Sequence, residues 1–296
     1  MTNSTWRSAA AFVMGIAASP AMAQTPILEL VFDEGSGTTA ANSGSLGAAA
    51  DGAISGATYS TSTPFGTGFS LSFDGDTDFV DIADAYDYGS TLTLEAWVKP
   101  DAVDGQRILF DDYGSPGVLL AISSGVLQFN LSTGTHPGLG TGIFAGSICP
   151  ELWQHVAGTY DGAIMRAYVN GIEVGTVETS GDIIDNGAFA ARIGAESEIP
   201  SVLEFAGRMD DFRLFLDALA PEALAGGSSL LLCGELTGDC AITASDALAA
   251  LLMAVGLSAA EPAADVNNTG TVSASDALQI LRIAVGTDEH TSTCNA

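Results

Sequence analysis

The sequence predicts a mainly β protein, an antiparallel β-sandwich, followed by a small helical tail. Three observations lead to this prediction. From Thr25 to about Arg213, apolar and polar residues alternate with a period of two, which is typical of strands with one buried face. Asp-Gly and Asn-Gly pairs lie between the strand-like runs, where hairpin turns need positive φ values. Near the C-terminus, one unit with helical spacing occurs twice at an interval of thirty residues.

Composition is that of a folded, strongly acidic protein. The chain has 296 residues, of which 47% are hydrophobic, and a formal net charge of −28. A chain of this length can fold into one large domain, or into a medium domain and a small one. Because the negative charge would repel phosphate backbones and anionic lipid, we predict no nucleic-acid partner. The apolar run from Ala247 to Ala260 is too short to cross a bilayer, so we predict no membrane insertion.

Residues 1–23 are expected to be a signal peptide. Arg7 supplies the positive charge, AAAFVMGIAA is an apolar run of signal length, and Ala21-Met22-Ala23 has the small-x-small pattern of a cleavage site. The mature chain would then begin at Gln24. We therefore expect a secreted or cell-surface protein.

The strand prediction is clearest in TLTLEAWV, residues 91–98. Four aliphatic side chains fall on one face, and Thr93, Glu95 and Trp97 fall on the other, so one face is expected in the core and the other in solvent. Farther on, WQHVAGTYDGAIMRAYVNGIEVGTV contains Asp161-Gly162 and Asn170-Gly171 between β-rich runs. This segment is predicted to be a three-strand meander.

Five ordered motifs between about Ile27 and Leu224 resemble the laminin-G-like branch of the concanavalin A-like jelly-roll family. They are LSFDGDTDFVDI, LTLEAWVKP, WQHVAGTYDG, AYVNGIEV and FAGRMDDFRLF. The resemblance implies an antiparallel jelly-roll sandwich of two packed sheets, in which the first and last strands pair. We place this domain at residues 24–225, a linker at 226–232 and a second domain at 233–296.

The sequence favours a binding module over an enzyme. Related glucanases carry two catalytic carboxylates in a Glu-x-Asp-x-x-Glu pattern, and this chain has no such pattern. A sugar-binding module would instead need an exposed aromatic platform, and Trp97, Tyr113, Trp153 and Tyr160 are the candidates. The alternative is that these four aromatic side chains pack the sandwich interior.

The jelly-roll resemblance also implies a calcium ion where the first and last strands meet. Transferred by motif, its ligands would be Asp210 and Asn42, with Asp33 and Asp211 as neighbours.

The tail contains ITASDALAALLMAVG from Ile242 and VSASDALQILRIAVG from Val272. Each copy predicts a helix that stops at Gly256 or Gly286. Their apolar positions follow helical spacing: Leu248, Leu251, Leu252 and Val255 in the first copy, and Leu278, Leu281 and Val285 in the second.

A twelve-residue loop precedes each tail helix and has the pattern of a calcium loop. In the second loop, DVNNTGTVSASD, the ligand positions hold Asp265, Asn267, Thr269, Thr271 through its carbonyl, Ser273 and Asp276. In the first loop, ELTGDCAITASD, they hold Glu235, Thr237, Asp239 and Asp246. Cys240 stands there in place of the turn glycine, and a non-glycine residue is uncommon at positive φ. We expect the first loop to bind calcium weakly or not at all.

Residues from about Cys233 to Gly286 resemble the type I dockerin family, whose calcium loops end in aspartate. The resemblance implies docking to a cohesin-like or cell-surface protein through Ala244-Ser245 and Ala274-Ser275. The alternative is a calcium-stapled helix pair that only caps or spaces the sandwich.

The four cysteines are expected to form structural disulfides, because such bonds persist outside the cytoplasm. Sequence alone leaves three full pairings open. The ends of dockerin-like modules lie close together, so the resemblance implies a Cys233–Cys294 pair, with Cys149 and Cys240 less determined.

Together these observations predict an exported, non-catalytic protein that binds a glycan or another extracellular ligand and carries a calcium-dependent docking tail. The alternatives are a secreted polysaccharide-degrading enzyme or its accessory subunit, and an adhesin that binds protein.

Overall fold

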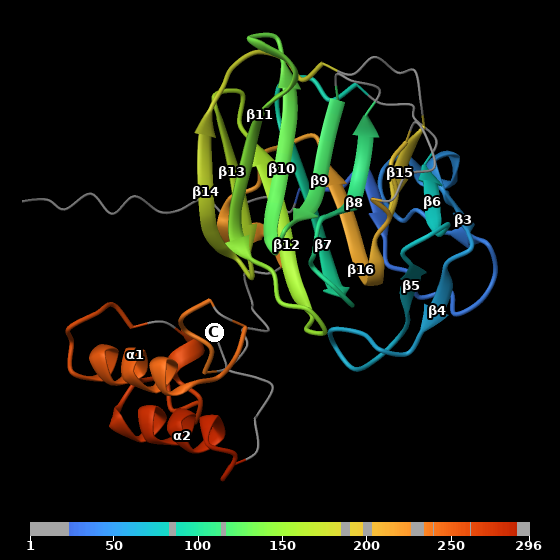
Figure 1. The fold of residues 1–296 in the computed structure, drawn as a ribbon. Coiled ribbons are helices and arrows are strands. Elements are labelled where there is room, and N and C mark those ends of the chain that lie inside the picture. The colour runs from blue at the N-terminus through green and yellow to red at the C-terminus, as the bar shows by residue number, and fades with distance from the viewer. Residues whose placement is uncertain are drawn as a thin grey trace, which may run out of the picture.

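A computed structural model describes residues 24–82, 87–113, 117–184, 190–197, 203–225, 234–238, 240–260 and 262–288. Two antiparallel sheets face each other, and a pair of helices follows them in the chain (Figure 1). The predicted signal peptide lies outside the described residues. None of the described helices is long and apolar enough to cross a membrane.

Each sheet has eight strands. The first sheet runs in the order β14 (Ile172–Glu178), β13 (Ile164–Val169), β12 (Gln154–Tyr160), β7 (Leu92–Pro100), β16 (Ala206–Phe215), β5 (Ser70–Asp74) and β4 (Thr58–Ser60), and β1 (Leu28–Leu30) pairs with β16. The second runs in the order β11 (His136–Ser147), β10 (Val126–Thr133), β9 (Gly117–Ser123), β8 (Gln106–Tyr113), β15 (Ala191–Ile193), β6 (Phe79–Ile82), β3 (Gly52–Ser55) and β2 (Thr39–Ala40).

The pairing of the first and last strands is confirmed. Leu28 of β1 lies opposite Leu214 of β16, and Leu30 lies opposite Phe212. The predicted meander is confirmed as β12, β13 and β14. Asn170 and Gly171 both have positive φ at its second turn, as a two-residue hairpin requires.

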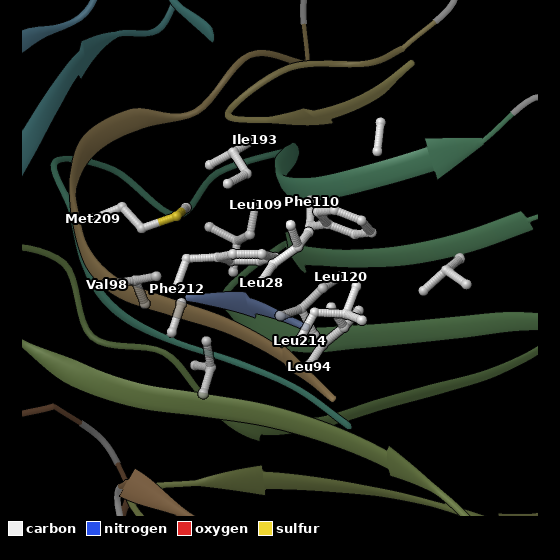
Figure 2. Close-up of a cluster of buried hydrophobic side chains, with 14 of the residues drawn as sticks. Leu28, Leu94, Val98, Leu109, Phe110, Leu120, Ile193, Met209, Phe212 and Leu214 are labelled. Atoms are coloured by element: carbon white, nitrogen blue, oxygen red, sulfur yellow. The ribbon is translucent and has the colours of Figure 1, made fainter. Parts of the chain in front are cut away.

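The hydrophobic core lies between the sheets. Figure 2 shows Leu94 of β7, Leu120 of β9 and Leu214 of β16 within it, and all three are fully buried. Burying an aliphatic side chain of this size contributes roughly 1.5–3 kcal/mol. The alternating residues of β7 point into this core, as the sequence predicts.

The opposite face of β7 is not in solvent, which corrects the sequence prediction. After β16 the chain folds back over it through a short 3-10 helix, Pro221–Ala223. The Leu219 N–H donates to Thr93 Oγ1 (2.9 Å), and the Ala225 N–H donates to Glu95 Oε2 (2.9 Å). Beside it, Leu219 and Leu224 pack with Ala157 of β12 and Tyr168 of β13. Residues more than one hundred positions later in the chain therefore bury it.

The tail contains helices α1 (Ala244–Ala254) and α2 (Ala274–Ala284), packed against each other (Figure 1). Two further 3-10 helices are Gly47–Ala50 and Pro262–Ala264. In both tail helices the aspartate of the third position closes a capping box, Thr243 with Asp246 and Ser273 with Asp276.

The tail core contains alanines and Ile280 instead of the leucines. Ala247, Ala250, Ala277 and Ile280 are buried in the tail core. The seven apolar positions with helical spacing are instead 39–64% exposed. The leucine faces of the two helices therefore lie outside this core.

Candidate functional site

Two of the four residues of the predicted aromatic platform are buried. Trp97 is 1% exposed and Tyr160 is 0% exposed. The Trp97 ring meets Phe65 and His155 edge-on, at 5.5 Å and 5.4 Å between centroids. Tyr160 donates its hydroxyl hydrogen to the Gly181 carbonyl (2.8 Å). These two rings cannot stack on a ligand at the surface in this arrangement.

The other two predicted aromatics lie elsewhere. Trp153 is half-buried and directly precedes β12. Tyr113 ends β8, and its side chain is outside the part of the chain that the structure describes. Of the four predicted aromatics, Trp97 and Tyr160 are therefore buried and Trp153 is half-buried.

A buried charged cluster lies beside Trp97. The Glu95 carboxylate is 3.1 Å from His155 Nε2 and 3.0 Å from Arg213 Nε, and it accepts the Ala225 N–H. Burial alone would raise the pKa of Glu95. The hydrogen bond and charge of His155 and the charge of Arg213 outweigh burial and lower this pKa. The cluster fastens the chain segment after β16 onto the sheet.

Asp210 and Asp211, two of the proposed calcium-site residues, lie on β16 beside β1, and the charge of Asp33 acts on both. A β-bulge between Asp210 and Arg213 sets Asp211 in the left-handed region, with φ of 47°. Burial raises the pKa of Asp210 to about 8, and the charges of Asp211 and Asp33 act in the same direction. Burial likewise raises the pKa of Asp211, although Arg213 opposes it. A proton or a cation would relieve this repulsion.

Asn42 has a different role from the one expected for a calcium ligand. Its Oδ1 accepts the N–H groups of Glu29 (2.9 Å) and Gly44 (2.8 Å). Its Nδ2 donates to the Ile27 and Gly47 carbonyls. These four bonds fasten a turn against β1, so the amide is already occupied by backbone. Among the described residues, no three His, Cys, Asp or Glu side chains are arranged to share a metal ion.

The outer face of the second sheet carries polar residues that the sequence reasoning missed. Gln106 Nε2 donates to Gln128 Oε1 (2.9 Å), and Gln128 Nε2 donates to Asn130 Oδ1 (2.9 Å). Phe144 lies opposite Gln128 in the register of β10 and β11 and is 57% exposed. The alternation in VLQFNLST, which puts Gln128 and Asn130 opposite the core residues, is the sequence signal that could have found this face.

The second tail loop folds around the carboxylates at its first and twelfth positions, Asp265 and Asp276. Asp265 accepts the N–H groups of Thr269 (3.0 Å) and Gly270 (2.6 Å). Asp276 accepts the N–H groups of Asn267 (3.2 Å) and Ser273 (2.9 Å). The carboxylates at loop positions one and twelve are therefore both held by backbone N–H groups of the loop itself.

The first tail loop differs at its glycine position. Cys240 has φ of 65°, close to the 82° of its counterpart Gly270, so the expected positive φ is confirmed. Glu235 accepts the N–H groups of Thr237 (3.0 Å) and Gly238 (2.6 Å), and Asp246 accepts those of Leu236 and Thr243. Asp239 lies outside the described residues.

A disulfide joins Cys149, which follows β11, to Cys240 in the first tail loop. This bond connects the sandwich covalently to the tail. Cys233 and Cys294 lie outside the described residues, so their pairing with each other stays a prediction.

Comparison with known proteins identifies the sandwich. The laminin G family described as "Concanavalin A-like lectin/glucanases superfamily" matches residues 74–225. No curated protein sequence matches the chain.

Several solved structures have a similar fold. The binding domain of Paraclostridial Mosquitocidal Protein 1 is 13% identical with a TM-score of 0.54, over 67% of this chain and 50% of that one. Domain 4 of AbnA, a GH43 extracellular arabinanase from Geobacillus stearothermophilus, in complex with arabinotriose, is 17% identical with a TM-score of 0.52, over 68% and 97%. The receptor binding domain of a botulinum neurotoxin C/D mosaic serotype is 13% identical with a TM-score of 0.53, over 70% and 52%.

At these identities the likeness concerns the fold alone, and the chain spans about half the length of the toxin domains. The arabinanase domain, in contrast, is covered almost completely by the sandwich. The family match extends over half of the chain and includes strands β7 to β16. The chain belongs to the concanavalin A-like lectin/glucanase superfamily.

Proposed function

We propose that this chain is an exported, non-catalytic binding protein whose sandwich binds a glycan and whose tail binds calcium and docks to a protein partner. One observation carries the glycan proposal: the sandwich covers 97% of an arabinanase domain solved with arabinotriose. The similar toxin structures are binding domains as well. A fold does not imply a function, so the ligand has to be found by experiment.

Export is supported by the N-terminal pattern and by the Cys149–Cys240 disulfide, a kind of bond that persists in oxidising compartments. Mass spectrometry of the protein recovered outside the cells should find Gln24 as the first residue. Recovery of the chain with Met1 intact would contradict a cleaved signal peptide.

The residues of the second tail loop fit calcium. Asn267 Oδ1 is buried and has no hydrogen-bond partner within the described residues, and it occupies the third ligand position. Asp265, Asp276 and the Thr271 carbonyl complete a set of hard oxygen donors, which calcium prefers. Bound calcium would supply positive charge between the two carboxylates. The loop's own backbone N–H groups hold those carboxylates in place.

Docking is supported by the exposed faces of the tail helices. Ala274, Ser275 and the equivalent Ala244 and Ser245 are exposed at the helix starts. Eight large aliphatic residues follow them on the surface: Leu248, Leu251, Leu252, Val255, Leu257, Leu278, Leu281 and Val285. Exposed large aliphatic side chains in this number are typical of a protein interface. A cohesin-like or cell-surface protein is the proposed partner.

A glycan array tests the central proposal. The full chain from Gln24 to Ala296 is applied in calcium and in excess chelator, and we expect binding to a defined subset of glycans in both. Binding to no glycan, together with binding to an extracellular protein, would favour the adhesin alternative. Release of reducing sugar by the pure protein would favour the enzyme alternative.

A further inference from the structure

We propose that the Cys149–Cys240 disulfide sets the calcium affinity of the second tail loop, so that calcium binding depends on the redox state of these two cysteines. This inference rests on the proposed calcium binding of the tail and adds a means of regulation to it. The oxidised bond holds the tail in place before calcium arrives. A thiol reductant that opens the bond weakens calcium binding.

The sandwich end of the bond is firmly placed. Cys149 is buried, and its N–H donates to Gln154 Oε1 (3.1 Å) while its carbonyl accepts from Gln154 Nε2 (3.0 Å). Gln154 is itself buried, as the first residue of β12. The first tail loop lies beside the end of β11, because a Cβ at Gly238 would be 3.6 Å from Ser147 Oγ. The disulfide therefore ties the first tail loop to a fixed point of the folded sandwich.

At the tail end of the bond, Cys240 occupies the place that glycine has in the second loop. Its φ of 65° lies in the left-handed region, where a side chain has a conformational cost that Gly270 avoids. Cys240 is half-buried, whereas Cys149 is buried. The bond thus holds Cys240 in an unfavourable backbone conformation, and Cys240 is the half of the bond that a thiolate from solution can approach.

The two tail loops share one core, through which a change in the first loop reaches the second. The Gly234 N–H, just before the first loop, donates to the Ala263 carbonyl (2.8 Å), just before the second. Val266 of the second loop is buried with Ile280 of α2, and Leu236 of the first loop packs against this cluster. Because each loop supplies part of one small core, loosening the first loop removes packing from the second.

Chain entropy gives the direction and the size of the effect. The Ala225 N–H fastens the segment after β16 to Glu95 Oε2 (2.9 Å), and Cys240 follows about fifteen residues later. When the tail unfolds from a folded sandwich, the disulfide closes this short stretch into a loop. Closing about fifteen residues favours folding of the tail roughly a hundredfold. Calcium binds the folded tail, so a part of this effect, about tenfold, is expected in its dissociation constant.

Opening the bond is a thiol–disulfide exchange that transfers two electrons. A thiolate of a dithiol reductant attacks Cys240 Sγ, the S–S bond breaks, and Cys149 leaves as a thiolate and takes up a proton. The second thiolate of the reductant attacks the mixed disulfide and releases Cys240 as a thiol, leaving the reductant as its own disulfide. Because coupling between two equilibria is mutual, bound calcium protects the protein disulfide from reduction by the same factor.

The test uses the oxidised full chain from Gln24 to Ala296 and two double variants. Cys149→Ser with Cys240→Ser removes the bond and keeps a side chain at positive φ, whereas Cys149→Ser with Cys240→Gly removes the bond and relieves the turn. Calorimetry measures the dissociation constant of calcium. We expect both variants to bind calcium about tenfold more weakly than the oxidised wild type, and wild type reduced by dithiothreitol to show the same loss.

Tryptophan fluorescence checks that the sandwich is folded in every sample. The mature chain has Trp97 and Trp153, both in the sandwich domain, and no tryptophan in the tail. The emission maximum of each variant should therefore equal that of the oxidised wild type. A loss of calcium affinity with an unchanged maximum is a property of the tail.

The outcomes separate the inference from the function on which it rests. If the oxidised wild type binds no calcium, the proposed calcium function fails and the inference fails with it. If it binds calcium and both double variants bind within about twofold of it, the function stands and the disulfide does not regulate it. If the glycine variant binds like wild type and only the serine variant is weakened, strain in the turn and not the tether sets the affinity, which also overturns the inference.

Discussion

Glu95 is a fully buried carboxylate that the surrounding residues keep ionised. Its partners are His155, Arg213 and the Ala225 N–H, which come from β12, β16 and the segment after β16. The lowered pKa of Glu95 means that its charged form stabilises the fold above the unfolded pKa. That contribution is lost as the pH falls through the folded pKa.

Glu95→Gln should therefore lower the free energy of unfolding by about 3–5 kcal/mol at neutral pH, because it leaves Arg213 without its buried counter-charge. Urea unfolding measures this change. The control is Asp104→Asn, whose carboxylate is 82% exposed and 3.7 Å from Arg107, and which should cost less than about 1 kcal/mol. If both substitutions lowered the free energy of unfolding equally, the buried Glu95 cluster would stabilise the fold no more than an exposed ion pair does.

Asp210 should make the protein less stable as the pH rises, which is opposite to the effect of Glu95. Its folded pKa is raised to about 8, so the native state holds the proton more tightly than the unfolded chain does. The resulting stabilisation is complete below the unfolded pKa, near about 4, and is lost as the pH rises toward about 8. Asp210→Asn should flatten the fall in melting temperature across this range in excess chelator. A wild-type profile that rises from pH 5 to 8 and is unchanged in the variant would contradict this assignment.

At the scale of elements, the two tail loops share one pattern, and we expect only the second to bind calcium well. Calorimetry of the full chain should detect one calcium ion in the second loop, with a dissociation constant on the order of 10⁻⁵ to 10⁻³ M. Asp276→Ala removes the closing carboxylate and Asn267→Ala removes the buried amide oxygen, so both should abolish or strongly weaken binding.

Asp246→Ala in the first loop is the matched control for Asp276→Ala. Both aspartates close a capping box, so both substitutions remove a helix cap, but only Asp276 is expected to hold the ion. If Asp246→Ala weakened calcium binding as much as Asp276→Ala did, the assignment of the ion to the second loop would be wrong.

At the scale of the whole molecule, the Cys149–Cys240 bond limits the freedom of the tail relative to the sandwich. The two cysteines are 91 residues apart in the chain, so the bond closes a long loop in the unfolded state. Replacing both with serine should lower the free energy of unfolding by about 2–4 kcal/mol. Urea unfolding of the oxidised wild type and the double variant tests this expectation, and identical midpoints would refute it.

The sequence by itself determined the features that depend on local interactions. The period-two alternation of β7, the Asn170-Gly171 turn and the capping boxes of α1 and α2 each depend on residues a few positions apart. The second loop is local in the same way, because Asp265 and Asp276 accept N–H groups from within twelve residues. These elements appear where the sequence places them.

Tertiary structure alone decided which faces are open. Trp97 and Glu95 have the alternation of solvent-facing residues, yet Phe65 and the segment ending at Ala225 cover them from elsewhere in the chain. Leu248 has the spacing of a core residue, yet the tail packs on its alanines. The partner of Cys240 is likewise set by how the sandwich and tail meet. A periodic pattern identifies two faces of an element, but only contacts between distant segments determine which of the two becomes buried.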